Sequence, residues 1–157
     1  KNELDQKILQ THALSFVDGN CYWYGYLIMD NYADVANTLV SGAHRSKSLI
    51  PAYTHMHKGR PSKVKKLTEV YTEDMHFLTW ESNKLSPSPE SANYFVVYRF
   101  RKGEKVDINN AANIVNITGD NFYVIPYESG RAEYTYVVTA VDSFHNESKP
   151  SKLKVKN

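Results

Sequence analysis

Residues 133–142 read Glu-Tyr-Thr-Tyr-Val-Val-Thr-Ala-Val-Asp, and this stretch decides the fold of the chain. Side chains of a β-strand point alternately to the two faces of its sheet, and this stretch alternates without interruption. One face is expected to carry Tyr134, Tyr136, Val138 and Ala140. The other face is expected to carry Thr135, Val137, Thr139 and Val141. The pattern therefore predicts one long β-strand.

Six shorter stretches between residue 61 and the C-terminus share the strand period of two. They are residues 64–70, 75–81, 94–101, 113–117, 121–125 and 152–156. Glycine, proline and asparagine separate many of them, as expected of turns. Seven short strands within about 95 residues match the size of an immunoglobulin-like sandwich of two packed sheets.

Residues 61–157 resemble the fibronectin type III family. Trp80 stands where that family has a buried tryptophan on its second strand, and Leu78 is the neighbour on the same face. The long strand is followed by Ser148-Lys149-Pro150, which fits the penultimate strand of that family. The resemblance implies a mainly β protein built as a sandwich.

The same resemblance assigns roles to residues of two further strands. In residues 94–98, it implies that Tyr94, Val96 and Tyr98 point inward. Tyr134 matches the tyrosine-corner position, whose hydroxyl bonds to backbone in the turn before it.

The first 60 residues follow a helical period instead. Residues 2–14 place leucine and isoleucine near one helical face, and a second helix follows Asn31 with stricter spacing. Its apolar positions are Tyr32, Val35, Ala36, Leu39 and Val40. Asn31 can cap the first turn, Asp34 suits the positive end of the helix dipole, and Gly42 can end the helix in a left-handed conformation.

Residues 19–29 form a nearly continuous aromatic and apolar run between these two helices. Such a run suits a strand buried on both faces in a parallel sheet, which gives the order helix, strand, helix. Every pattern is broken across residues 55–62. We therefore expect two domains, residues 1–60 and residues 61–157.

Three stretches of the first domain form a recognisable set: residues 19–23 (Gly-Asn-Cys-Tyr-Trp), 35–39 (Val-Ala-Asn-Thr-Leu) and 44–53 (His-Arg-Ser-Lys-Ser-Leu-Ile-Pro-Ala-Tyr). They resemble the closing strand and helix of glycosyl-hydrolase-like (β/α)8 barrels related to family ten glycosidases. The resemblance implies the C-terminal part of a secreted, periplasmic or cell-surface bacterial protein acting on polysaccharide. The chain begins without methionine or a signal peptide, so we expect a fragment whose targeting signal lies upstream.

Glycoside hydrolysis generally uses two carboxylates at the C-terminal ends of barrel strands. Asp18 precedes the expected strand and therefore lies at the wrong end, and the next acid is Asp30. We expect no catalytic residue in this chain, and we expect the parent protein to hold the catalytic pair.

The aromatic run could instead supply flat rings that stack on sugars. Trp23 and Tyr26 are the better candidates for substrate binding, with Asn20 and Asp30 as hydrogen-bonding neighbours. Alternation predicts that the other two rings of the run, Tyr22 and Tyr24, fill the core.

Composition narrows the remaining classes of function. The net charge is +2, from 19 Lys and Arg against 17 Asp and Glu, and lysines alternate along two expected edge strands, where they discourage aggregation. The sequence has no basic stripe with interleaved aromatic residues, so it does not predict nucleic-acid binding. Cys21 is the single cysteine. The sequence has no run of about 18 apolar residues, so it predicts no membrane span. The spacing of His55, His57, Asp74 and His76 does not match a known metal site. We expect no metal or cofactor.

Two functions remain open. In the first, the sandwich is a spacer or buttress in a secreted glycoside hydrolase that acts on polysaccharide. In the alternative, the chain is a non-catalytic carbohydrate- or protein-binding module, for which aromatic residues of the sandwich are candidates: Phe100, Phe122, Tyr123, Tyr127 and Phe144. We also expect the apolar run at residues 21–29 to be covered, either by the sandwich or in a homodimer.

Overall fold

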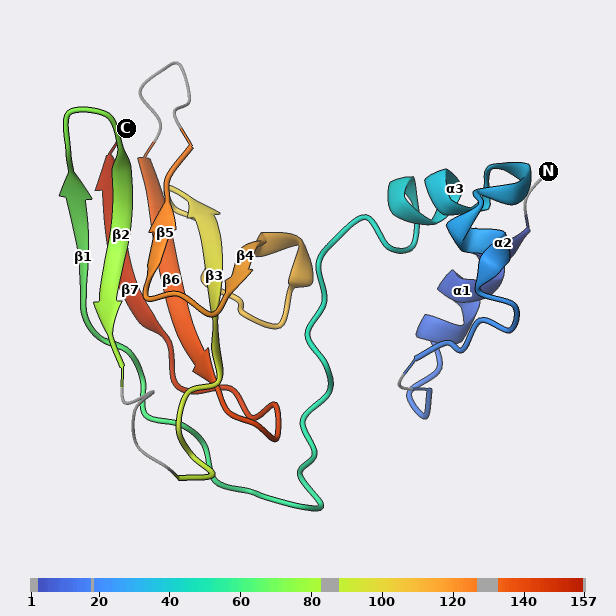
Figure 1. The fold of residues 1–157 in the computed structure, drawn as a ribbon, viewed down its shortest axis with the longest axis horizontal. Coiled ribbons are helices and arrows are strands. Elements are labelled where there is room, and N and C mark those ends of the chain that lie inside the picture. The colour runs from blue at the N-terminus through green and yellow to red at the C-terminus, as the bar shows by residue number, and fades with distance from the viewer. Residues whose placement is uncertain (1–2, 18, 83–87, 127–132, 157) are drawn as a thin grey trace. The chain divides into compact units, whose positions relative to one another are not determined.

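A computed structural model of the protein describes residues 3–17, 19–82, 88–126 and 133–156 (Figure 1). The chain forms two compact units, Lys1–Lys47 and Ser48–Asn157. The sequence patterns led us to expect the division near residues 55–62. In the structure residues 48–60 belong to the second unit, for the packing reason given below.

The second unit is a sandwich of two antiparallel sheets (Figure 1). One sheet has the order β1-β2-β5 and consists of β1 (Lys65–Tyr71), β2 (His76–Glu81) and β5 (Phe122–Val124). The other has the order β4-β3-β6-β7 and consists of β3 (Tyr94–Arg101), β4 (Ile114–Thr118), β6 (Glu133–Val141) and β7 (Ser151–Lys156). A short 3-10 helix, η2 (Ala111–Asn113), precedes β4. The predicted mainly β sandwich of two sheets is confirmed.

The core between the sheets forms around Trp80, as predicted. Trp80 is buried on β2 beside fully buried Leu78. Its indole meets the ring of Phe95 edge to face, with centroids 5.5 Å apart, a preferred arrangement for aromatic pairs. From β6, Tyr136, Val138 and Ala140 enter the same core. The alternation of the long strand thus separates its two faces as the sequence indicated.

On β3, the inward set differs from the one that the resemblance implied. Phe95 and Val97 face the core between the sheets, whereas Val96 and Tyr98 belong to a second buried cluster on the opposite face. Every one of these four residues is fully buried. The prediction was wrong because β3 is apolar on both faces, so alternation alone cannot tell the inner face from the outer.

The second cluster explains why residues 48–60 belong to the sandwich. It consists of Val96, Tyr98, Phe100, Ile114, Val137 and Val141, with partly buried neighbours that include Leu49 and Ile108. Leu49 comes from the segment before β1, which is also tied down by a hydrogen bond from the Tyr53 N–H to the Phe144 carbonyl, 2.9 Å long. The central strands are therefore covered on both faces.

Two carboxylates lie in the turn that follows β6, and both are occupied by hydrogen bonds. Asp142, fully buried, accepts from the backbone N–H groups of Phe144 and Asn146, each at 2.8 Å. Glu147 Oε1 accepts from the hydroxyls of Tyr98 and Thr139, each at 2.6 Å. These bonds satisfy buried charge and fix the turn.

The first unit contains short helices around a small core. They are α1 (Leu4–His12), α2 (Tyr26–Met29), the 3-10 helix η1 (Tyr32–Asp34) and α3 (Val35–Ser41). Ile8 of α1 and Leu39 of α3 are the buried hydrophobic residues among the described part of this unit. No described helix is long and apolar enough to cross a membrane.

Of the two predicted ends of α3, one is confirmed and the other is not. Asn31 Oδ1 accepts from the backbone N–H groups of Ala36 and Asn37, so the predicted cap is confirmed. Gly42, however, has a φ of −108°, and the predicted left-handed ending was wrong. The glycine is needed for space, because a Cβ atom there would collide with the Asp5 carboxylate, which accepts from the Ala43 N–H at 2.6 Å.

The strand predicted over residues 19–29 is absent, and that prediction was wrong. The run forms coil followed by α2, and Tyr24 has a left-handed φ of 65°, which lies outside the region of regular strands. Local bonds satisfy the backbone: the Met29 N–H donates to the Gly25 carbonyl at 3.1 Å and the Asp30 N–H to the Tyr26 carbonyl at 2.8 Å. A parallel strand needs neighbouring strands, and the described residues of this unit supply none.

Candidate functional site

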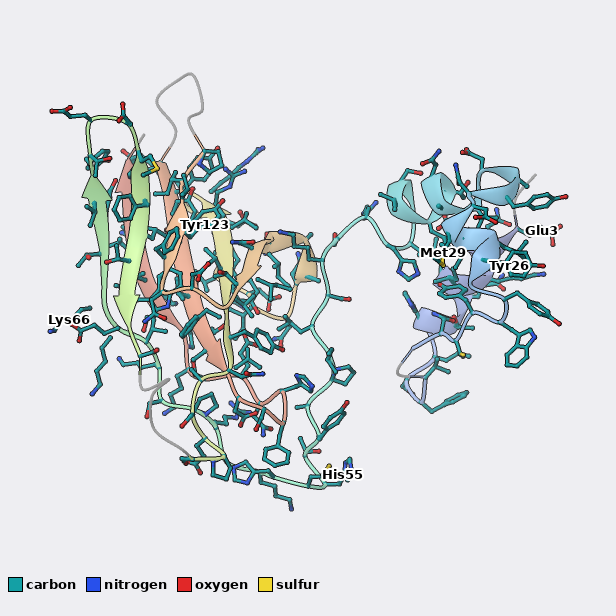
Figure 2. All side chains as sticks on the ribbon, in the orientation of Figure 1. Glu3, Tyr26, Met29, His55, Lys66 and Tyr123 are labelled. Carbon is teal, nitrogen blue, oxygen red and sulfur yellow. The ribbon has the colours of Figure 1, made fainter. Side chains whose placement is uncertain are left out.

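Three exposed rings of the first unit form what we call the aromatic cluster: Trp23, Tyr24 and Tyr26. The exposed fractions are 81% for Trp23, 60% for Tyr24 and 57% for Tyr26. Neighbouring rings meet edge to face, with centroids 5.6 Å apart for Trp23 and Tyr24 and 5.8 Å apart for Tyr24 and Tyr26. Two of the candidate residues thus lie in one row of rings joined through Tyr24. Figure 2 shows Tyr26 and Met29 on α2.

The two polar candidates have different surroundings. Asn20 is exposed, and its amide bonds to Thr11 Oγ1 at 2.9 Å and to His12 Nε2 at 3.1 Å, which holds it at the C-terminal end of α1. Asp30 is exposed and ends α2, two residues after the isoleucine of that helix. Asp30 follows Tyr26 by four residues, whereas the Asn20 amide is already engaged by residues of α1.

Tyr22 and Tyr24 behave differently, although alternation predicted that both would fill a core. Tyr22 is half-buried, its hydroxyl is 2.6 Å from His44 Nε2, and burial raises the pKa of the phenol. Tyr24 is exposed, so its prediction was wrong, because the run is not a strand and has no alternating faces. Gly19 at the start of the run and Gly25 within it were the available signal for a loop.

The histidines pair with acids or rings. His57 Nε2 lies 3.7 Å from Glu90 Oε1, and the His57 ring packs against Phe144. His76 Nε2 lies 2.7 Å from Glu69 Oε1. Across the residues that the structure describes, no group of three or more His, Cys, Asp or Glu side chains could hold a metal ion.

The sandwich aromatics that motivated a binding module are mostly structural. Phe100 is fully buried, Tyr123 packs against the core, and Phe144 is half-buried. Phe122 on β5 is 49% exposed and is the one solvent-facing ring of that set in the described residues. Tyr127 lies outside the described residues.

Tyr134, the predicted tyrosine corner, also faces a charged neighbour that the sequence did not reveal. The Arg99 guanidinium carbon is 4.7 Å from the centroid of its ring, within the range of a cation–π contact. The turn that should receive the Tyr134 hydroxyl, residues 127–132, lies outside the described residues. That hydrogen bond stays a prediction.

Comparisons with known proteins give structural neighbours only. No family model matches the chain, and no curated protein matches it. Among solved structures, the spore cortex lytic enzyme SleM of Clostridium perfringens is similar at 17% identity and a TM-score of 0.44, over 62% of this chain and 28% of that one. A fibronectin type III-like protein of Clostridium thermocellum is similar at 21% identity and a TM-score of 0.41, over 60% of this chain and 93% of that one. A segment of titin is similar at 16% identity and a TM-score of 0.44, over 62% of this chain and 32% of that one. The matched region thus spans 28% of the length of SleM.

Proposed function

We propose that the chain is a non-catalytic accessory region of a secreted bacterial protein that degrades polysaccharide. In this role the sandwich acts as a spacer or buttress. The proposal rests mainly on the burial of the central strands of the sandwich, which are covered by packed side chains on both faces. The sequence of residues 19–53 resembles a glycosidase barrel ending and motivates the choice of parent protein, although residues 19–29 form no strand.

The two carboxylates of the turn after β6 are poorly suited to glycoside hydrolysis. A catalytic pair flanks the scissile bond at about 5 to 9.5 Å, and both acids must reach the sugar. Asp142 has no exposed surface, and Asn146 donates to both of its oxygens, from the backbone N–H and from Nδ2. One Glu147 oxygen is shared by two hydroxyl donors. These acids therefore stabilise the turn through hydrogen bonds, which favours a structural role.

The test compares this chain with the protein expressed from its complete reading frame, on soluble xylan, cellulose, chitin and peptidoglycan. We expect reducing sugar to be released by the complete protein and not by residues 1–157. Release by residues 1–157 alone would contradict the non-catalytic role. A complete protein that releases sugar from none of these polymers would contradict the choice of parent.

A second candidate function is sugar binding by the aromatic cluster. Exposed aromatic rings provide flat apolar surface with polar edges, which suits the faces of pyranose rings. A row of three such rings on one short segment is unusual for a surface that binds nothing. Asp30, next to α2, would then supply a hydrogen bond to a sugar hydroxyl.

Retention on insoluble polysaccharide tests this second function with a matched pair of variants. Trp23→Ala should reduce retention of the chain by about threefold or more, since a ring contact contributes about 0.5 to 1.5 kcal/mol. Phe122→Ala removes an exposed ring from the sandwich and should leave retention unchanged. Loss of retention in Phe122→Ala alone would assign binding to the sandwich instead.

Self-association is the remaining proposal for the apolar run. Trp23 and Met29 are more than four-fifths exposed, at 81% and 86%, so a homodimer that buries them would gain hydrophobic free energy. Sedimentation velocity should show a dimer that dissociates in the Met29→Ser variant. A monomer at all concentrations would exclude the homodimer.

A further inference from the structure

A groove lined by lysines runs between the first residues of β1 and β7. We call it the lysine groove and define it by Lys63, Lys65, Lys66 and Lys152. It has a volume of about 500 Å³, and its floor is joined by a hydrogen bond from Ser151 Oγ to the Val64 carbonyl, 2.7 Å long. β1 and β7 are edge strands of the two sheets and contact each other, and Figure 1 shows where these two strands run in the sandwich.

A β-bulge in β1 is what turns two consecutive lysines outward. The register with β2 shifts between Lys65 and Thr68, and Lys66 has a left-handed φ of 47°. Val64 is buried, Lys65 and Lys66 are exposed, and Leu67 packs against the core. In a regular strand Lys66 would share the buried face of Val64. The bulge re-aims one side chain, and Figure 2 shows Lys66 extending away from β1.

The groove concentrates positive charge on a nearly neutral chain. The net charge of the whole chain is only +2, yet the described residues that line the groove include four lysines and no acid. Glu81 at the rim accepts from Lys66 Nζ at 2.8 Å, and this bond raises the pKa of Lys66. Exposed Lys154 continues the row, because alternate residues of β7 share the face of Lys152.

We propose that the lysine groove binds a linear anionic polysaccharide, whose carboxylates or sulfates contact Lys63, Lys65, Lys66 and Lys152. This binding site is separate from the aromatic cluster and does not depend on the sugar stacking proposed for it. The partner is identified by charge complementarity: several lysine ammonium groups along one groove suit a polymer with repeated anionic groups.

The lining of the groove favours a polysaccharide over other polyanions. Proteins that bind single-stranded nucleic acid combine positive charge with aromatic rings for base stacking, and the described lining contains neither an aromatic ring nor an arginine. An acidic peptide would gain most by adding a strand to β1, but a bulge and paired lysines at an edge oppose strand addition. An anionic polysaccharide requires only the charges.

The experiment measures binding of the full chain to polygalacturonate, with neutral pullulan as the polymer control, in low salt and in 0.5 M NaCl. We expect binding to polygalacturonate only, weakened by salt because exposed charge contacts are screened. The variant Lys63→Gln/Lys65→Gln/Lys152→Gln should bind about a hundredfold more weakly, because each exposed charge contact removed weakens binding by about fivefold.

A second triple variant controls for net charge. Lys7→Gln/Lys58→Gln/Lys105→Gln changes the charge of the chain by the same amount at exposed lysines outside the groove, and it should bind like the unaltered chain. Equal weakening in both triple variants, or no binding to polygalacturonate at low salt, would overturn the proposal. Tighter binding to thirty-residue oligo-dT or to polyglutamate than to polygalacturonate would overturn the choice of polymer. None of these results bears on retention by the aromatic cluster.

Discussion

The two tryptophans of the chain lie in opposite environments, one in each unit. Trp80 is 4% exposed and its indole contacts Phe95, whereas Trp23 is 81% exposed beside other exposed rings. The sandwich buries the alternating residues of its central strands on both faces. The helical unit has short helices and, among its described hydrophobic residues, only Ile8 and Leu39 are buried.

This contrast separates residues that stabilise the fold from residues that offer surface. Packed sheets bury a larger share of a chain than short helices do, and helices of a few turns gain most of their stability from tertiary packing. We therefore assign stability to the sandwich and ligand contact to the aromatic cluster and the lysine groove. The predictions below test that division, beginning with the largest expected effect.

Replacing Trp80 with alanine should cause the largest loss of stability. The change removes a buried indole from the core and leaves a cavity, which costs about 3–5 kcal/mol. Urea unfolding followed by circular dichroism measures the free energy of unfolding. A cost below about 1 kcal/mol would show that Trp80 does not hold the sheets together.

Tyr98→Phe should destabilise the sandwich by about 2 kcal/mol at pH 8, because it removes a hydroxyl that donates to the Glu147 carboxylate. Burial and that hydrogen bond raise the pKa of Tyr98 above its ordinary value of 10.0. Unfolded chains lose the Tyr98 proton from about pH 10 upward while folded chains keep it, so this contribution is complete below pH 10 and declines above it.

The pH dependence supplies the control for Tyr98. The difference in unfolding free energy between the unaltered chain and Tyr98→Phe should shrink above pH 10, by at most about 1.4 kcal/mol per pH unit. Tyr94, whose pKa is also raised by burial and by Glu147 and Asp142, is present in both proteins and cancels. A difference that stays constant from pH 8 to pH 11 would contradict the account.

Gly42→Ala should destabilise only the helical unit, by about 1–2 kcal/mol, because the new Cβ atom displaces the Asp5 carboxylate from the Ala43 N–H. Gly19→Ala is the matched control, since a Cβ atom there meets nothing within 4 Å. Hydrogen exchange in α1 and α3 measures the effect. Equal exchange rates in both variants would contradict the packing role assigned to Gly42.

Trp23→Ala should have the smallest effect on stability, less than about 0.5 kcal/mol, as is usual for exposed positions. The same urea titration used for Trp80→Ala gives the comparison directly. A loss of stability close to that of Trp80→Ala would show that the aromatic cluster belongs to a core.

The sequence predicted the sandwich well because its strands carry a period that the sheets then use. Residues 133–142, Trp80 and Leu78 all lie as expected, since polar and apolar residues mark the two faces. The same reasoning was wrong for β3, because both faces of that strand are apolar. The prediction for residues 19–29 was wrong for another reason. An unbroken apolar run fits a buried strand, but it forms a strand only where neighbouring strands pair with it.

The candidate sites could be predicted only in part. Trp23 and Tyr26 were found from residue type, whereas Tyr24 was missed because its exposure depends on a left-handed backbone. The lysine groove depends on the bulge at Lys66 and on β1 lying beside β7. Both are tertiary features, so alternating lysines alone indicated only protected sheet edges.

Hydrogen exchange of the full chain tests the division between the two units most directly. The account predicts that backbone amides of β3 and β6 exchange at least about a hundredfold more slowly, relative to unfolded rates, than those of α1 and α3. Equal protection of the central strands and of these helices, lost together in one unfolding transition, would contradict it.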